Sequence, residues 1–167
     1  APAVRVQTEL GQAGVLGIFD NFTWSNTSGG NTETKNYAYN SINQLTDITG
    51  AETAAFSYNP MGLMTQQVRG GLSTLYEHDD LNRLTKVRVN PGAAEIRSTY
   101  SYLDASWRRA QALIEDFGNP ANNLTTTYGW DGFACISQTT NGVTTIYGVL
   151  DRMPLWEKTG SQVLTYC

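Results

Sequence analysis

The sequence predicts an all-β fold in which antiparallel β-hairpins follow one another along the chain and form a long, twisted and coiled sheet. Three observations lead to this prediction. An aromatic motif recurs at nearly constant spacing, and turn-forming residues follow each copy of it. Charged residues make up only 16% of the chain, and Thr, Asn, Ser and Gly take their place. That composition suits sheets and turns better than solvated helices.

The motif consists of an aromatic residue, any residue, a second aromatic residue, Asn or Asp, two residues, Gly or Asn, one residue and a large apolar residue. Three segments match it closely, YAYNSINQL, FSYNPMGLM and YEHDDLNRL, and three match it more loosely. Eight of the nine tyrosines fall in its first or third position, so the segments form a tandem array. The six copies begin at Tyr37, Phe56, Tyr76, Tyr100, Tyr128 and Tyr147.

Each position of the motif has a physical role in a hairpin. Residues two apart on a strand lie on the same face, so the paired aromatic residues share one face of the sheet. These positions hold Tyr37, Tyr39, Phe56, Tyr58, Tyr76, His78, Tyr100, Tyr102, Tyr128, Trp130 and Tyr147.

The next residues are expected to form a turn, because Asn and Asp bond the backbone two residues on and Gly or Asn tolerates a positive φ. The turn positions hold Asn40, Asn43, Asn59, Gly62, Asp79, Asn82, Asp131 and Asp151. The returning strands are expected to open at Leu45, Met64, Leu84, Ile136 and Trp156.

The motif divides the chain into three parts. Residues 1–36 are predicted to form an N-terminal strand or linker segment, in which IFDNFTW resembles a decayed seventh copy. Residues 37–160 hold the six hairpin repeats, and residues 161–167 form a C-terminal strand tail. VRVQTEL, VLGIF and QVLTYC are read as further strands. Because one hairpin of about 20 residues is marginally stable alone, the repeats are expected to pack side by side.

One segment, SWRRAQALIEDFG from Ser106, fits either of two structures. It has an N-cap, strong helix formers and a terminating glycine, which favour a helix. The repeat register instead places it on a returning strand, and we expect the array to override local propensity. The following GNPANN is predicted to be a loop rather than a new element.

Residues that could support catalysis or bind a metal have simpler structural explanations. His78 is the only histidine and occupies an aromatic position of the motif. The adjacent carboxylates Asp79-Asp80 and Glu115-Asp116 would point to opposite faces of a strand, so neither pair converges as an acid/base pair must. The sequence also lacks known nucleophile, phosphate-binding and zinc-protease motifs. We therefore expect no enzyme activity, no metal and no cofactor.

Composition also bears on partners. The net charge of −4 and the absence of a basic run argue against nucleic acid. No apolar run approaches the roughly 20 residues that a membrane helix needs. The chain begins APAV, which is expected for a processed form or a fragment. Trp24, Trp130 and Trp156 could stack on sugars, but hairpin-to-hairpin packing is the favoured interpretation.

The repeat unit resembles the YD repeat of the Rhs proteins, of bacterial toxin-complex C components and of the animal teneurins. The resemblance runs from Tyr37 to Gly160. It implies that the hairpins form an open segment of a hollow β-shell. Such a shell encloses a toxic C-terminal segment in the bacterial toxins and stands on the cell surface in teneurins. A closed shell takes many more repeats, and the Asp-Pro core that follows them in such proteins is not found here. The cleavage and toxic activities are therefore not expected.

The leading hypothesis is a secreted, extracellular structural protein whose open edges and terminal strands pair with copies of itself to build a filament or shell. One alternative is a fragment of an encapsulating toxin shell, which would pair with flanking shell segments. Another is a carbohydrate-binding adhesion module. Cys135 and Cys167 could form a disulfide within or between chains, as expected outside the cytosol.

Overall fold

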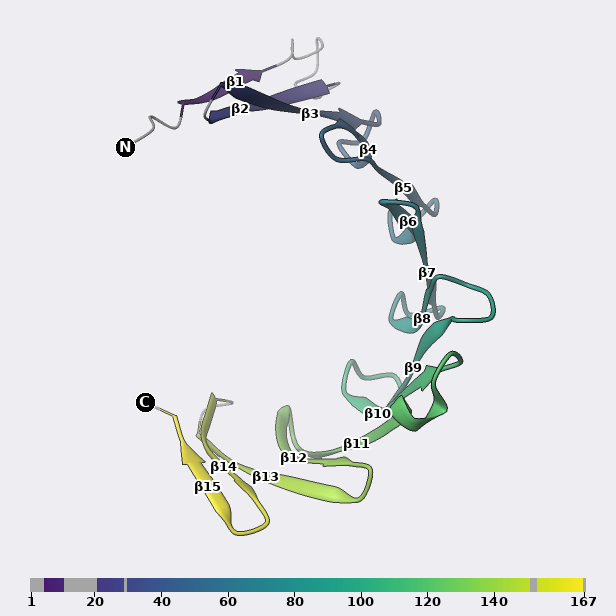
Figure 1. Cartoon of the computed structure of the whole chain (residues 1–167). Helices are drawn as coiled ribbons and strands as arrows, with labels where there is room; N and C mark the ends of the chain where they lie inside the picture. Colours follow the sequence, from purple (N-terminus) through teal and green to yellow (C-terminus); the bar gives the residue numbers. More distant parts are fainter. Residues whose placement is uncertain (1–4, 11–20, 29, 151–152, 167) are drawn as a thin grey trace. The chain divides into compact units, whose positions relative to one another are not determined.

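The computed structural model describes residues 5–10, 21–28, 30–150 and 153–166 of the chain. These residues form fifteen strands and one short 3-10 helix, and none of them belongs to a helix long and apolar enough to cross a membrane (Figure 1). The first seven strands are β1 (Arg5–Leu10), β2 (Asn21–Ser28), β3 (Asn31–Tyr39), β4 (Leu45–Gly50), β5 (Ala54–Tyr58), β6 (Met64–Arg69) and β7 (Leu72–His78). The others are β8 (Leu84–Val89), β9 (Ile96–Tyr102), β10 (Arg109–Asp116), β11 (Leu124–Asp131), β12 (Ala134–Thr140), β13 (Val143–Leu150), β14 (Met153–Thr159) and β15 (Gln162–Thr165).

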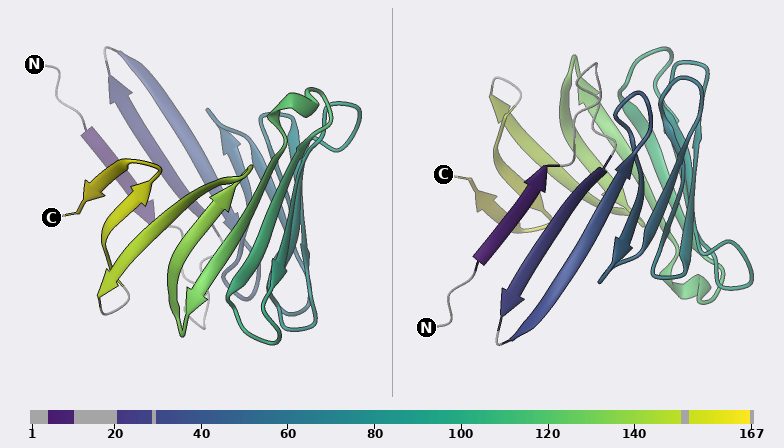
Figure 2. Two further views of the ribbon diagram at one scale, coloured as in Figure 1. Left: turned by 90° about the horizontal axis from the view of Figure 1, so that it is seen from below. Right: turned by 90° about the horizontal axis from the view of Figure 1, so that it is seen from above.

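The strands pair in the order of the sequence, from β1 to β15. The pairs are antiparallel, so the predicted all-β array of hairpins is confirmed (Figure 2). The chain divides into two compact units, residues 1–75 and 76–167. We call them the N-terminal and C-terminal units. Their boundary falls inside β7, whereas the repeat pattern placed boundaries after residues 36 and 160.

The six motif copies form the hairpins β3–β4, β5–β6, β7–β8, β9–β10, β11–β12 and β13–β14. The first hairpin begins at Asn31, earlier than the expected Tyr37, because the strand extends back through residues that pair with β2. Two of the additional strands lie where they were expected, β1 in VRVQTEL and β15 in QVLTYC. VLGIF and the first part of IFDNFTW lie outside the described residues.

The returning strands carry a β-bulge next to the third motif position. Tyr39 pairs with Leu45 while Ala38 pairs with Asp47, so Thr46 is the extra residue. The Thr46 hydroxyl donates a hydrogen bond of 3.2 Å to the carbonyl of Ala38. The corresponding Thr85 makes the same bond, also 3.2 Å, to the carbonyl of Glu77. A bulge of this kind bends the strand and increases its twist.

The last two returning strands correct the sequence prediction. β12 opens at Ala134 rather than Ile136, and β14 opens at Met153 rather than Trp156. In β12 it is Cys135 that pairs with the third-position Trp130, and Ile136 is the bulged residue. The reason is a shorter turn, because only Gly132 and Phe133 separate β11 from β12.

The ambiguous segment after Ser106 is a strand, β10, as the repeat register predicted. Its connection to β11 contains one turn of 3-10 helix, Pro120–Asn122, where only a loop was expected. Asn119 caps this turn by accepting a hydrogen bond from the Ala121 N–H. Proline at the first helical position favours such a turn, because its missing N–H would have no partner there.

Few of the described side chains are fully buried. The buried apolar residues are Ile48, Ala54 and Ala112, and Glu95 is a buried charged residue. Most other strand residues are partly exposed. Neighbouring hairpins must therefore supply much of the stability through side-chain contacts along the sheet.

Candidate functional site

The turns of the first three repeat hairpins share one geometry. Asn40, Asn59 and Asp79 each accept two hydrogen bonds at one side-chain oxygen, from the backbone N–H groups two and four residues on, at 2.9 to 3.1 Å. The backbone N–H of each of these residues donates to the carbonyl four residues on, at 2.9 Å. The residue three positions on has positive φ, +61° at Asn43, +82° at Gly62 and +62° at Asn82. The turns are therefore built as their residue types predicted.

The fourth turn is built from different residues and is one residue longer, because the Leu103 N–H donates to the carbonyl of Arg108, five residues on, at 2.9 Å. Leu103 occupies the position of Asn or Asp, so its side chain cannot accept the hydrogen bonds. The hydroxyl of Ser106 replaces the missing acceptor and receives the Arg108 N–H at 3.2 Å. Asp104, with φ of +43°, accepts from the Ser106 N–H at 3.0 Å. A serine hydroxyl thus restores the turn locally.

A second set of hydrogen bonds joins successive turns within each unit. In the N-terminal unit, the Gln44 amide donates to the carbonyl of Gly62 at 3.0 Å. In the C-terminal unit, Arg83 donates to the carbonyls of Asp104 at 2.8 Å and Ser106 at 2.6 Å. Arg108 donates to the carbonyl of Gly132 at 2.8 Å. Each donor stands at the end of one turn, and each acceptor is a backbone carbonyl in the next turn.

Arg83 also organises its own turn. Its guanidinium donates from Nε to Oδ2 of Asp79 at 2.7 Å, and its Nη2 also lies 2.7 Å from the same oxygen. The guanidinium carbon lies 4.6 Å from the ring centre of Tyr102. Burial alone would raise the pKa of Asp79, but the hydrogen bonds from Arg83 and Leu81 outweigh it and hold that pKa below its ordinary value.

The third aromatic position of a repeat bonds the preceding repeat. Tyr58 donates from its hydroxyl to the carbonyl of Leu45 at 2.8 Å, and Tyr102 donates likewise to Leu84 at 2.6 Å. The indole N–H of Trp130 donates to the carbonyl of Arg109 at 2.8 Å. Sequence reasoning assigned these residues to the aromatic face and missed their polar bonds. A signal was present, because tyrosine, tryptophan or histidine occupies this position in the first five copies, while phenylalanine occurs only in the first position.

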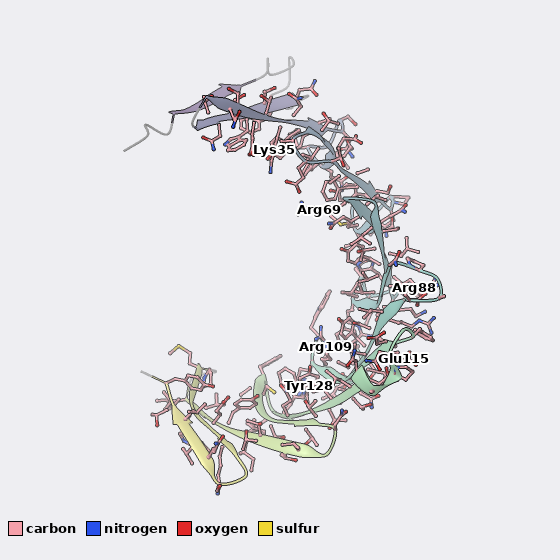
Figure 3. The ribbon with its side chains drawn as sticks, in the orientation of Figure 1. Lys35, Arg69, Arg88, Arg109, Glu115 and Tyr128 are labelled. Carbon is pink, nitrogen blue, oxygen red and sulfur yellow. The ribbon has the colours of Figure 1, made fainter. Side chains whose placement is uncertain are left out.

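Two connecting loops are each held by a glutamate between two cations. Glu52, between β4 and β5, pairs with Lys35 at 2.6 Å and Arg69 at 3.2 Å. Both cations are labelled in Figure 3. The hydrogen bond from Lys35 is the largest cause of the lowered pKa of Glu52. Glu95, between β8 and β9, accepts two hydrogen bonds from Arg88 at 3.0 and 2.8 Å, and one from Arg97 at 2.8 Å. These bonds, the Arg88 bonds foremost, lower the pKa of Glu95 to about 2. Nothing in the repeat motif predicted either cluster.

The other residues that the sequence offered as possible catalytic or metal-binding groups do not lie together in one site. His78 is half-buried at the end of β7, Asp79 is held in its turn, and Asp80 is exposed. Glu115 lies 4.0 Å from Arg97, whereas Asp116 accepts backbone N–H bonds from the following loop. No group of three or more His, Cys, Asp or Glu residues among the described positions could hold a metal ion.

Cys135 is a half-buried free thiol that donates to the carbonyl of Ser137 at 3.4 Å, and burial raises its pKa. The disulfide with Cys167 and the turn role of Asp151 fall outside the described residues and stay predictions. Trp24 lies beneath the Lys35 ammonium, at 5.8 Å from nitrogen to ring centre. Trp156 packs over Gly148, where a Cβ would collide with its indole ring. These contacts favour the packing interpretation of the tryptophans over sugar stacking.

The last strands expose much apolar surface. β15 stands last in the strand order and has β14 as its neighbour. Val163 and Leu164 are adjacent on β15, so they lie on opposite faces, and they are 58% and 59% exposed. Leu150 and Met153 in the preceding hairpin are also exposed. An edge strand with apolar residues on both faces favours pairing with another strand.

Comparison with known proteins identifies a solved structure with a similar fold. No family model and no curated protein matches this sequence. A solved structure does. The crystal structure of TcdB2-TccC3-TEV resembles this chain with a TM-score of 0.62 over 84% of the chain, at 12% sequence identity. The chain spans only 8% of the length of that neighbour. The likeness shows the fold alone, an antiparallel array of hairpins.

Proposed function

We propose that this chain is a non-enzymatic wall segment of a larger β-shell, and that its terminal strands pair with further strands of the same kind. The observation that carries the proposal is the match of most of this chain to 8% of a much longer protein chain. Such a segment would extend the wall of a shell, since the side chains of its hairpins form hydrogen bonds to neighbouring hairpins and do not gather at one reactive site.

The contacts between repeats support this role. Within each unit, one turn bonds the next through side chains such as Gln44 and Arg83. Tyr58 and Tyr102 bond the strand of the preceding repeat. These bonds link nearest neighbours along the sheet, as in repeat proteins whose stability sums over adjacent units. Such an array can be lengthened at its end without changing its interior.

The exposed β15 edge is the place where we expect the next strand to add. In a longer shell the added strand comes from a flanking shell segment. In the isolated chain, a second copy can supply it, and such head-to-tail pairing would build an open filament. The proposal also includes an extracellular location, which rests on the likeness of the repeats to those of secreted and surface proteins.

The test follows association of the purified chain. Light scattering at increasing protein concentration should show association through the edge, and electron microscopy should distinguish filaments from closed assemblies. Val163→Lys together with Leu164→Lys should suppress association, because charges on an edge strand block pairing.

Met61→Lys is the matched control, since it adds a charge at a turn residue that is 70% exposed. This variant should associate like the unmodified chain. A chain that stays monomeric at every concentration, or associates equally well with both edge lysines, would contradict the proposed edge pairing.

A further inference from the structure

The C-terminal unit carries a hollow on one face of its sheet, lined mainly by aromatic side chains. Its volume is about 390 Å³, within the size range of small-molecule sites. Arg109 and Tyr128, both labelled in Figure 3, are among the residues that line it. The lining residues are Tyr102, Trp107, Arg109, Tyr128, Trp130 and Cys135.

Arg109 departs from the repeat pattern at this hollow. It pairs across the hairpin with Tyr102, just as Leu45 pairs with Tyr39 and Met64 with Tyr58. The position therefore holds a large apolar residue in the closely matching repeats and a cation here. The repeat architecture does not require that cation, because an aliphatic residue serves at the same place elsewhere.

The guanidinium of Arg109 also lacks the oxygen partner that other arginines have. Its carbon lies 4.1 Å from the ring centre of Tyr100, and its Nε is buried without a hydrogen-bond partner. Among the arginines whose side chains the structure describes, every other one bonds a carboxylate or a backbone carbonyl. These arginines are Arg69, Arg83, Arg88, Arg97 and Arg108. A buried donor without an acceptor favours binding of a ligand that supplies one.

The other polar groups of the hollow restrict the class of ligand. The hydroxyl of Tyr102 and the indole N–H of Trp130 already donate to backbone carbonyls. The Cys135 thiol donates to the carbonyl of Ser137. Besides Arg109, the lining side chains leave only the Tyr128 hydroxyl and the Trp107 indole N–H to bond a ligand, so a sugar would keep most of its hydroxyl groups without partners. A flat apolar molecule with a single carboxylate fits better, because the rings cover its body and the guanidinium pairs with its charge.

We propose that this hollow binds an aromatic carboxylate, with the carboxylate on Arg109 and the aromatic body against Trp107. Trp107 is 69% exposed, so a ligand ring can cover it. Two sources share this chemistry, a free aromatic acid and the α-carboxylate of a polypeptide that ends in an aromatic residue. The inference is independent of the wall-segment proposal, because it concerns one face of two neighbouring repeats and not the strand edge.

The test compares indole-3-acetate with indole-3-acetamide by isothermal titration calorimetry on the whole chain. The acid should bind at least about tenfold more tightly than the amide, since only the acid forms the charged pair. In Arg109→Leu this preference should disappear. The variant should keep its fold, because Leu45 stands at the equivalent position of the first repeat. Arg69→Leu, outside the hollow, is the control and should keep the preference.

A second variant, Trp107→Ala, should weaken binding of the acid and the amide alike, because it removes a ring that both ligands contact. An acetylated dipeptide ending in tryptophan with a free carboxylate distinguishes the two sources by its affinity relative to indole-3-acetate. Equal binding of acid and amide, an unchanged preference in Arg109→Leu, or no binding of any probe at millimolar concentration would overturn the proposal.

Discussion

The hydroxyl of Tyr58 donates a 2.8 Å hydrogen bond to the backbone carbonyl of Leu45, the first residue of the preceding returning strand. Tyr102 and Trp130 repeat this relationship in the C-terminal unit. The bond reaches from one repeat to the previous one, close to the bulge, where the sheet ladder is interrupted. A single aromatic side chain thus joins two repeats by packing and by a hydrogen bond.

Replacing the tyrosine hydroxyls should destabilise the chain. We expect Tyr58→Phe and Tyr102→Phe each to cost about 1 kcal/mol, because each leaves a partly buried carbonyl without its donor. Urea denaturation followed by circular dichroism measures this loss. Tyr128→Phe is the control, since the described residues show no hydrogen bond from its hydroxyl, and it should change stability by a few tenths at most. Equal losses in all three variants would contradict the role of the bond.

The positive-φ turn residues should respond in opposite directions to substitution. Gly62→Ala is expected to cost roughly 1 kcal/mol or more, because an L side chain is strained at a φ of +82°. Its added Cβ would also lie 3.2 Å from the Gln44 amide that bonds this turn. Asn82→Gly should be neutral or slightly stabilising, since glycine adopts the φ of +62° without strain. Thermal melts of both variants test this contrast, and a harmless Gly62→Ala would refute it.

The cluster around Glu95 should make stability sensitive to acid. The pKa of Glu95 is lowered to about 2 in the folded chain, from an ordinary value of 4.5. Its contribution is therefore fully present above about pH 4.5 and is lost as the pH falls toward 2. Melting temperatures between pH 2 and pH 7 should show this decline.

Glu95→Gln should melt at a lower temperature at neutral pH and lose less stability on acidification. Some acid sensitivity should remain, because Glu52, Asp79 and Asp116 also have lowered pKa values. The exposed Glu33→Gln serves as the control and should follow the unmodified chain. Parallel pH profiles for the Glu95 variant and the unmodified chain would contradict the prediction.

The Cys135 thiol should react slowly in the folded chain. Burial raises its pKa, so the reactive thiolate is scarce at neutral pH. We expect iodoacetamide to label Cys135 several-fold more slowly in the folded chain than in urea, as mass spectrometry of the peptide that contains it can show. Equal labelling rates in the two states would contradict the structure around this residue.

Much of the fold was predictable because the repeat constrains each hairpin in several ways at once. The strand at Arg109–Asp116 is the clearest example, since its local composition favours a helix and the register alone indicated a strand. The shift at Ala134 was not predictable from the motif, because a shorter turn moves the start of the strand without changing its aromatic residues. The glutamate clusters were missed because their cations are distant in sequence and belong to no repeat position.

By itself, the sequence determined the fold class, the six hairpins and the chemistry of the turns, since these depend on local spacing, on the period of two along a strand and on the φ preferences of Asn and Gly. Only the tertiary structure decided which groups meet between hairpins. In the folded chain the Tyr58 hydroxyl donates to the Leu45 carbonyl, and Glu95 lies between two arginines. Arg109 packs against an aromatic ring, and its buried Nε has no hydrogen-bond partner. Those contacts depend on strand register and bulges, because a register shift of one residue would turn each side chain of the strand to the opposite face of the sheet.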